Sequence, residues 1–148
     1  MPRSKIREAI RSYMEARLDE AAFLRSEFDG CGETRSGVDK AIRGMVQDGE
    51  LLRVGYGAYV RARRMISPVT KEPMIGTIVV PEVWAWQTLR KLGVDPQPNS
   101  ALRDYNEGRS TQIPVWLAFD VGRSRIRRKI RLGKRELIYE RSTPNTPN

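Results

Sequence analysis

Hydrophobic side chains recur at helical spacing over the first part of the chain. One side of residues 6–18 carries Ile6, Ile10, Tyr13, Met14 and Leu18, and charged side chains fill the opposite side. This pattern predicts an amphipathic first helix. A second short helix is predicted over residues 20–28, where Phe23, Leu24 and Phe28 would share one side, and two glycines at 30 and 32 end it.

The third predicted helix has the most regular pattern in the chain. Its apolar stripe consists of Val38, Ala41, Ile42, Met45 and Val46, at positions i, i+3, i+4, i+7 and i+8. Ser36 and Asp39 have the spacing of a capping box at its start, and Gly49 is expected to close it. Burial of the stripe would turn Arg35, Ser36, Lys40, Arg43 and Gln47 outward.

Two short runs with strand character follow, at residues 51–54 and 58–61, around Gly55, Tyr56 and Gly57. They predict a β-hairpin with a glycine-flanked turn, in which Tyr59 packs into the core. Helices followed at once by a tight basic hairpin are typical of a winged helix-turn-helix. We therefore expect residues 1–64 to form a DNA-binding domain of that type.

The second half predicts a small α+β domain over residues 81–141, after a proline-bearing connector at 65–80. Its helix would run from Pro81 to about Leu92 and end at Gly93, and Trp84 and Trp86 favour a buried helix over a base-stacking platform. A short helix is expected over residues 100–107. From Pro114 the periodicity changes to two, which predicts an antiparallel basic sheet with strands over 115–119, 123–132 and 135–141, and residues 142–148 read as a disordered tail.

Charge adds a preference for a polyanionic partner. The 148 residues contain 27 Lys and Arg against 18 Asp and Glu, with no histidine, so the net charge is +9. Residues 1–64 contribute 13 − 10 = +3 and residues 65–148 contribute 14 − 8 = +6, and residues 123–135 hold eight cations and no acid. Such a dense run favours nucleic acid as a counter-ion, although a solubility role and an acidic protein partner stay open.

These patterns assign candidate DNA contacts to three groups. The third helix would read bases in the major groove, because Arg forks onto guanine and Ser bonds base edges or phosphate. The hairpin with its following residues, and the basic strand, would hold phosphates. The candidates are Thr34, Arg35, Ser36, Lys40 and Arg43 on the helix, Arg53, Tyr56, Arg61, Arg63 and Arg64 on and after the hairpin, and Arg123, Arg125, Arg127, Lys129 and Arg131 on the basic strand.

Other classes of function find little support. No window approaches eighteen uncharged apolar residues and the N-terminus has no apolar signal core, so we expect a cytoplasmic protein with no membrane partner. Cys31 is the single cysteine and there is no histidine, so neither a metal site nor general acid–base chemistry has its usual groups. We expect no cofactor, no metal and no enzymatic activity.

Two parts of the chain resemble a known family. Residues 38–42 and 48–59 look like the winged-helix segment of AbiEi-type antitoxins and their short relatives, and residues 110–114 with 122–125 are similar to a second signature of those relatives. The resemblance implies a transcriptional regulator that is the autoregulating antitoxin of a type IV toxin–antitoxin system. It also implies an inverted-repeat operator, suited to a homodimer, and a neighbouring nucleotidyltransferase-like toxin, whose direct contact with the chain stays open.

Two alternatives remain beside a sequence-specific regulator. One is an RNA-binding or nucleoid-type protein that uses the same charge without reading sequence. The other is a protein-interaction module that neutralises a toxin by direct contact. Equal affinity for random nucleic acid favours the first, and salt-resistant co-purification with a neighbouring gene product favours the second.

Overall fold

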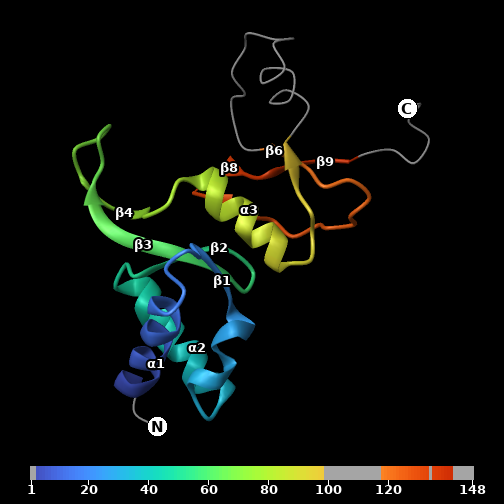
Figure 1. The fold of residues 1–148 in the computed structure, drawn as a ribbon. Coiled ribbons are helices and arrows are strands. Elements are labelled where there is room, and N and C mark those ends of the chain that lie inside the picture. Colours follow the sequence, from blue (N-terminus) through green and yellow to red (C-terminus); the bar gives the residue numbers. More distant parts are fainter. Residues whose placement is uncertain (1–2, 99–117, 134, 142–148) are drawn as a thin grey trace, which may run out of the picture. The chain divides into compact units, whose positions relative to one another are not determined.

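A computed structural model describes residues 3–98, 118–133 and 135–141 of the chain (Figure 1). The fold is mixed α+β, and the chain divides into two compact units, residues 1–88 and 89–148. None of the helices in the described ranges combines the length and the apolar character that a membrane crossing requires.

The first unit begins with α1 (Arg3–Glu15), followed by β1 (Ala22–Leu24), the 3-10 helix η1 (Arg25–Cys31) and α2 (Arg35–Gln47). The apolar stripe of the first predicted helix is buried at Ile6, Ile10 and Met14. Leu18 is not part of it: α1 ends at Glu15, and Leu18 is 80% exposed in the following turn.

The second predicted helix is wrong in its first part. Ala22 and Leu24 pair with Val60 and Ala58 of β3 (Ala58–Ile66), so this segment is a strand, and only residues 25–31 are helical, in 3-10 form. The reason is tertiary: β3 offers hydrogen-bonding groups on the edge that faces residues 22–24, and those pairs place Phe23 in the core.

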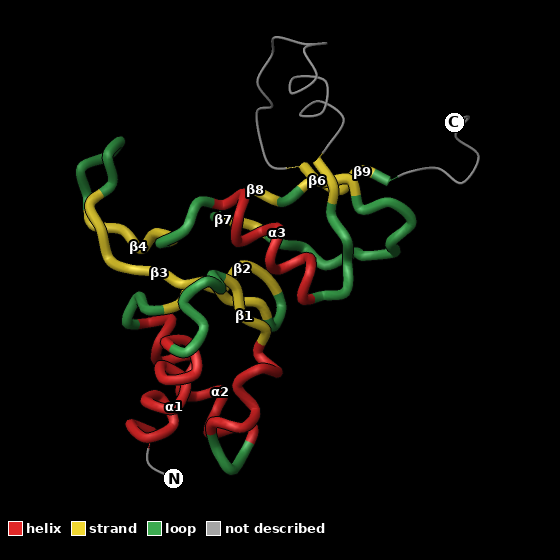
Figure 2. The backbone as a smooth tube through the Cα atoms, in the orientation of Figure 1, coloured by secondary structure: helices red, strands yellow, loops and turns green. Residues whose placement is uncertain are grey.

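The hairpin is confirmed. β2 (Leu51–Gly55) pairs antiparallel with β3, and the turn falls at Tyr56 and Gly57, where Gly57 has a φ of +64° that favours glycine. The unit's sheet has the order β1-β3-β2, and β4 (Pro73–Thr77) pairs antiparallel with the later part of β3. β3 therefore continues through the predicted boundary at residue 64, and residues 65–80 contain strand structure in addition to connecting loop (Figure 2).

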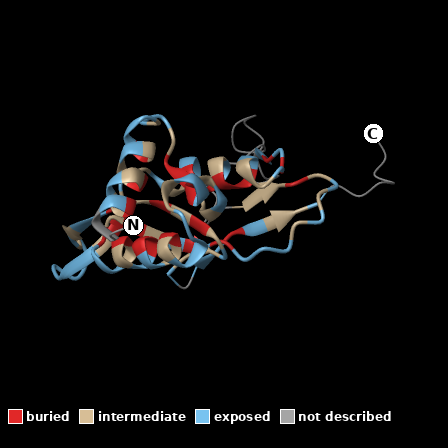
Figure 3. Ribbon diagram, turned by 90° about the horizontal axis from the view of Figure 1, so that it is seen from below, coloured by how far each residue is buried: buried red, intermediate tan, exposed pale blue. Residues whose placement is uncertain are grey.

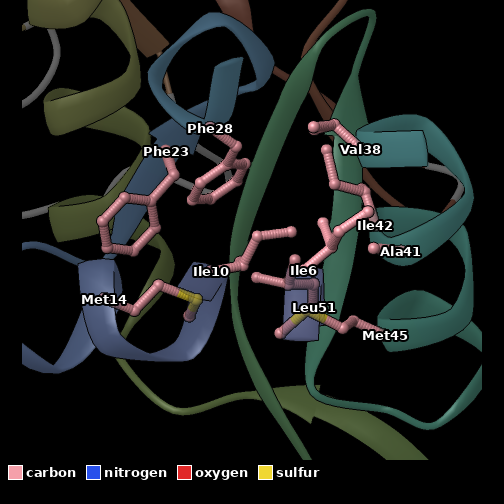
Figure 4. Packing of buried hydrophobic residues seen from close by; sticks show 10 residues of the cluster. All are labelled: Ile6, Ile10, Met14, Phe23, Phe28, Val38, Ala41, Ile42, Met45 and Leu51. Atoms are coloured by element: carbon pink, nitrogen blue, oxygen red, sulfur yellow. The ribbon is translucent and has the colours of Figure 1, made fainter. Parts of the chain in front are cut away.

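The core of the first unit lies between α1, η1, α2 and the sheet (Figure 4). Val38, Ala41, Ile42 and Met45 are buried, which confirms the predicted stripe of α2, and buried and exposed positions alternate along the helices (Figure 3). Tyr13, Phe23 and Phe28 form a cluster of aromatic rings whose centroids lie 5.6–6.1 Å apart. Tyr59 is partly buried against the same core, as its position predicted.

The start of α2 differs from the predicted capping box. Thr34 is the cap residue, and its Oγ1 accepts a hydrogen bond of 3.0 Å from the backbone N–H of Gly37. Ser36 is already helical, and Asp39 bonds to Arg25 instead. The cap lies two residues earlier because Thr34 itself has the extended backbone that a cap residue needs.

The helix α3 (Pro81–Lys91) begins at the predicted proline, and Gly93, with a φ of +86°, follows its end. Trp84 is 1% exposed and Trp86 43% exposed, so burial is confirmed for the first tryptophan alone. In the second unit, β6 (Ala118–Asp120) pairs antiparallel with β5 (Gln97–Pro98) and parallel with β9 (Ile138–Glu140), and β7 (Arg131–Leu132) pairs with β8 (Arg135–Glu136).

The expected antiparallel basic sheet is therefore only partly formed. Its predicted strand over 123–132 is strand only at β7, and the loop between β6 and β7 takes up the rest (Figure 2). The helix expected over 100–107, the segment 110–114, the start of the strand at 115–117 and the tail at 142–148 lie outside the described residues.

Candidate nucleic-acid interface

The outward side of α2 carries a compact polar stripe. Ser36, Lys40, Arg43 and Gln47 are all exposed, opposite the buried residues of the same helix. At 100° per residue these four positions lie within about 60° of one another around the helix axis. The stripe is free of acidic side chains, so α2 presents a narrow cationic and hydrogen-bonding surface to an approaching ligand.

Thr34 and Arg35 lie at the N-terminal end of this stripe. Both are exposed, but the Thr34 hydroxyl is occupied as the helix cap, and its Oγ1 lies 3.5 Å from the Oγ of Ser36. Thr34 therefore stabilises the first turn of α2, and the exposed hydroxyl of Ser36 lies next to the Thr34 hydroxyl.

The β2–β3 hairpin stands beside α2 across an open groove of about 490 Å³. Arg53 on β2 is exposed, with its Nε 3.3 Å from the carbonyl oxygen of Gly55, and Tyr56 at the turn is 73% exposed. The groove brings together four arginines from three elements and one acid: Arg25 of η1, Arg35 and Arg43 of α2, Arg53 of β2, and Asp39 of α2. Its formal charge is thus 4 − 1 = +3, which suits an anionic ligand.

Arg25 was not among the residues singled out from the sequence. Its side chain is 15% exposed, its Nε donates to Asp39 over 2.6 Å, and a second nitrogen donates to Asp29. Its backbone N–H donates to the carbonyl oxygen of Gly57 over 2.8 Å. Arg25 therefore joins η1, α2 and the hairpin turn, and the spacing of Arg25 and Asp29 at i and i+4 was the one signal in the sequence.

The electrostatics of Arg25 follow from these bonds. Burial acts to lower the pKa of its guanidinium, but the bonds to Asp39 and Asp29 outweigh that effect and hold the pKa above its ordinary value. Arg25 thus keeps its charge while one of its two partners, Asp39, lies in the groove.

Arg61 does not belong to the interface. Its guanidinium turns inward and donates to three backbone carbonyl oxygens: those of Glu20 at 2.6 Å, Met14 at 2.5 Å and Arg17 at 2.8 Å. It also lies over the Phe23 ring, 5.1 Å from the centroid. Burial lowers its pKa, and the nearby acidic Glu20 and Asp19 oppose that effect. The predicted phosphate contact is in fact a tie between β3 and the end of α1 with the turn that follows it, where the carbonyl oxygens of Met14 and Arg17 also accept from the backbone N–H groups of Arg17 and Glu20.

Arg63 and Arg64 are exposed on β3 but lie outside the groove. They border a separate hollow of about 370 Å³, together with Arg11 and Glu50, and the Nε of Arg64 lies 3.3 Å from the carbonyl oxygen of Asp48. The structure therefore places them at the C-terminal end of α2, away from its first turn.

The cations predicted on the basic strand belong to the second unit. Arg123, Arg125, Arg127, Lys129 and Arg131 are all exposed, but only Arg131 lies in a strand, and the alternation with inward positions breaks at Arg128, which is exposed as well. Ile126 is half-buried and Ile130 is buried between them. The pattern of the sequence thus gave the exposed side correctly and the strand assignment wrongly.

Cys31 is partly buried at the end of η1, and burial raises the pKa of its thiol. Within the described ranges, no group of three or more Cys, Asp or Glu side chains is placed to hold a metal ion. No family model, curated protein or solved structure matches the chain.

Proposed function

We propose that residues 1–66 form a winged helix-turn-helix that binds duplex DNA, with α2 in the major groove and the β2–β3 turn on the adjacent backbone. The element order α1-β1-η1-α2-β2-β3 and the sheet order β1-β3-β2 support this arrangement. A helix of about 10–12 Å diameter fits the major groove, which is about 12 Å wide.

The observation that carries the proposal is the shared groove. Arg35 and Arg43 of α2 and the exposed hairpin residues Arg53 and Tyr56 border one cationic hollow, so one duplex can meet both elements. In this arrangement Lys40, Arg43 and Ser36 approach base edges, while Arg53 and Tyr56 meet sugar and phosphate. The proposal therefore predicts that sequence specificity depends on the α2 residues and that sequence-independent affinity depends on the hairpin residues.

The biological role we propose is transcriptional regulation of the chain's own promoter. The resemblance of residues 38–42 and 48–59 to antitoxins supports an autoregulating antitoxin, and an inverted-repeat operator would be bound by a homodimer with one α2 for each half-site. Partnership with a nucleotidyltransferase-like toxin is a prediction that rests on that resemblance alone.

The experiment compares the full chain on duplex DNA from upstream of its own gene with a scrambled duplex of equal length. We expect Lys40→Ala and Arg43→Ala each to cost about 1–3 kcal/mol on the upstream duplex and much less on the scrambled one. Arg53→Ala should weaken both duplexes alike and reduce the salt slope by about one unit.

A matched control is Lys71→Asn, which removes an exposed cation from the β3–β4 turn. The strand from Tyr59 to Ile66 carries that turn about 24 Å from the groove, and Asn tolerates the φ of +63° at this position. This variant should bind as the parent does. Equal losses on both duplexes for Lys40→Ala and Arg43→Ala would contradict base reading and favour the non-specific alternative.

A further inference from the structure

Residues 123–130 of the second unit are fastened along one edge by side chains and backbone of residues 137–141. The carbonyl oxygens of four alternate residues accept these bonds. Arg141 donates to Ser124 over 3.2 Å and also to Ile126, the Tyr139 hydroxyl donates to Arg128 over 2.6 Å, and the Leu137 N–H donates to Ile130 over 2.7 Å.

After the turn at residues 122–123, this alternation is that of an extended segment with two unlike edges. In an extended chain the N–H and C=O of one residue point to one edge, and those of the next residue point to the other. The even-numbered residues therefore face residues 137–141. Over the described ranges, no hydrogen bond engages the main-chain groups of Arg125, Arg127 or Lys129, which point to the opposite edge.

The open edge lies in the most cationic part of the chain. The side chains of Arg125, Arg127 and Lys129 are exposed, whereas Ile126 and Ile130 turn inward. An open groove of about 360 Å³ adjoins the segment at Arg127 and Arg128, and its further wall includes Leu92 and Val94. Main-chain groups without a hydrogen bond and exposed cationic side chains thus occur on the same stretch.

We propose that this edge, residues 125–129, binds an extended acidic segment of a partner protein by strand addition. A peptide strand supplies both donors and acceptors to the main-chain groups of Arg125, Arg127 and Lys129. Its acidic side chains, at every second position, would lie beside the cations at Cβ separations of about 4.5–5.5 Å.

Two other occupants fit less well. Nucleic-acid phosphates would accept from the N–H groups but would leave the carbonyl groups on the same edge unpaired. A second copy of this chain, paired edge to edge, would set the like charges of Arg125, Arg127 and Lys129 opposite one another, and such pairs are destabilising. Strand addition by an acidic peptide pairs both the N–H and the C=O groups of this edge and places acidic side chains beside the cations.

The test uses the full chain and three fluorescent probes of equal charge: a ten-residue peptide of alternating Glu and Val, a ten-residue peptide of alternating Glu and Pro, and a short oligothymidylate. Proline lacks the N–H that a ladder needs and cannot continue a strand. We expect the Glu-Val peptide to bind about tenfold or more tightly than the Glu-Pro peptide, since two or more main-chain bonds separate them. Equal peptide affinities, or tighter binding of the oligonucleotide, would overturn the proposal.

Variants of Arg127 separate charge from backbone. Arg127→Ala removes the cation and keeps the N–H, whereas Arg127→Pro removes both, and Lys71→Asn in the first unit serves as the charge control. We expect Glu-Val binding to fall several-fold with Arg127→Ala, to fall further with Arg127→Pro, and to stay unchanged with Lys71→Asn. If the proline variant does not fold, the comparison of the two peptides on the unaltered chain still tests strand addition. DNA binding by α2 is tested separately through Lys40→Ala and Arg43→Ala.

Discussion

The Arg25 guanidinium donates to the Asp39 carboxylate over 2.6 Å, and this bond ties the start of η1 to α2 beside its exposed stripe. The two side chains are 15% and 39% exposed, so the pair is screened less than a fully exposed ion pair. Because Arg25 also holds the hairpin turn through its backbone, one residue sets the spacing between the two parts of the proposed DNA surface.

Arg25→Ala should therefore lower both stability and DNA affinity. We expect a loss of about 1–3 kcal/mol in the free energy of unfolding, since charge-assisted hydrogen bonds to a partly buried group are removed, measured by urea denaturation. Asp39→Asn should keep a neutral hydrogen bond with Arg25 and should therefore lose less of the free energy of unfolding than Arg25→Ala. If Arg25→Ala unfolds at the same urea concentration as the parent, the tie contributes nothing to the fold.

Arg61→Ala should affect stability and leave DNA binding by the folded protein intact. Removal of the guanidinium leaves the carbonyl groups of Met14, Arg17 and Glu20 without this donor, at a cost of about 2–3 kcal/mol in the free energy of unfolding. Arg53→Ala is the matched comparison, because Arg53 is exposed and should show the opposite result, with weaker DNA binding and unchanged stability. If Arg61→Ala reduced the salt dependence of DNA binding, Arg61 would contact the DNA backbone, contrary to this prediction.

The Tyr13 hydroxyl gives the first unit a dependence on alkaline pH. Burial and the 2.7 Å bond to Glu27 raise the pKa of Tyr13 to about 12 from its ordinary value of 10.0. The folded state thus favours the protonated phenol, and its contribution to stability is complete below about pH 10 and lost as the pH rises toward 12.

The measurement is urea unfolding between pH 9 and 12 for the parent and for Tyr13→Phe. The variant should show a shallower loss of stability over this range. Burial also raises the pKa of Tyr139 to about 12, so part of the dependence should remain. Identical pH profiles for parent and variant would exclude Tyr13 as its source.

Gly49→Ala should destabilise the junction between α2 and β2. Gly49 has a φ of +81°, and an added Cβ would lie 3.2 Å from Cγ of Arg64 and 3.3 Å from Cγ1 of Ile75. We expect a cost of about 1–2 kcal/mol in the free energy of unfolding, measured as a lower thermal midpoint. Gly30→Ala is the control, because its Cβ would meet no atom within 4 Å and should change the midpoint little.

Much of the first unit was predictable because its signals are local. The stripe from Val38 to Met45 has helical period, and Gly57 permits the turn conformation that joins β2 to β3, so neither needed information from distant residues. The exposure of the cations from Arg123 to Arg131 was predictable for the same reason, although Arg128 interrupts their alternation with inward positions.

Tertiary structure decided the rest. Residues 22–24 became a strand because β3 lies beside them, and Arg61 turned inward because the last carbonyl groups of α1 are within its reach. Residues 123–130 lack a full ladder because Arg141 and Tyr139 bind their carbonyl groups through side chains. The sequence by itself determined which side chains are polar or apolar and their local period, whereas the direction of each long arginine depended on which carbonyl or carboxylate oxygens the fold brought near.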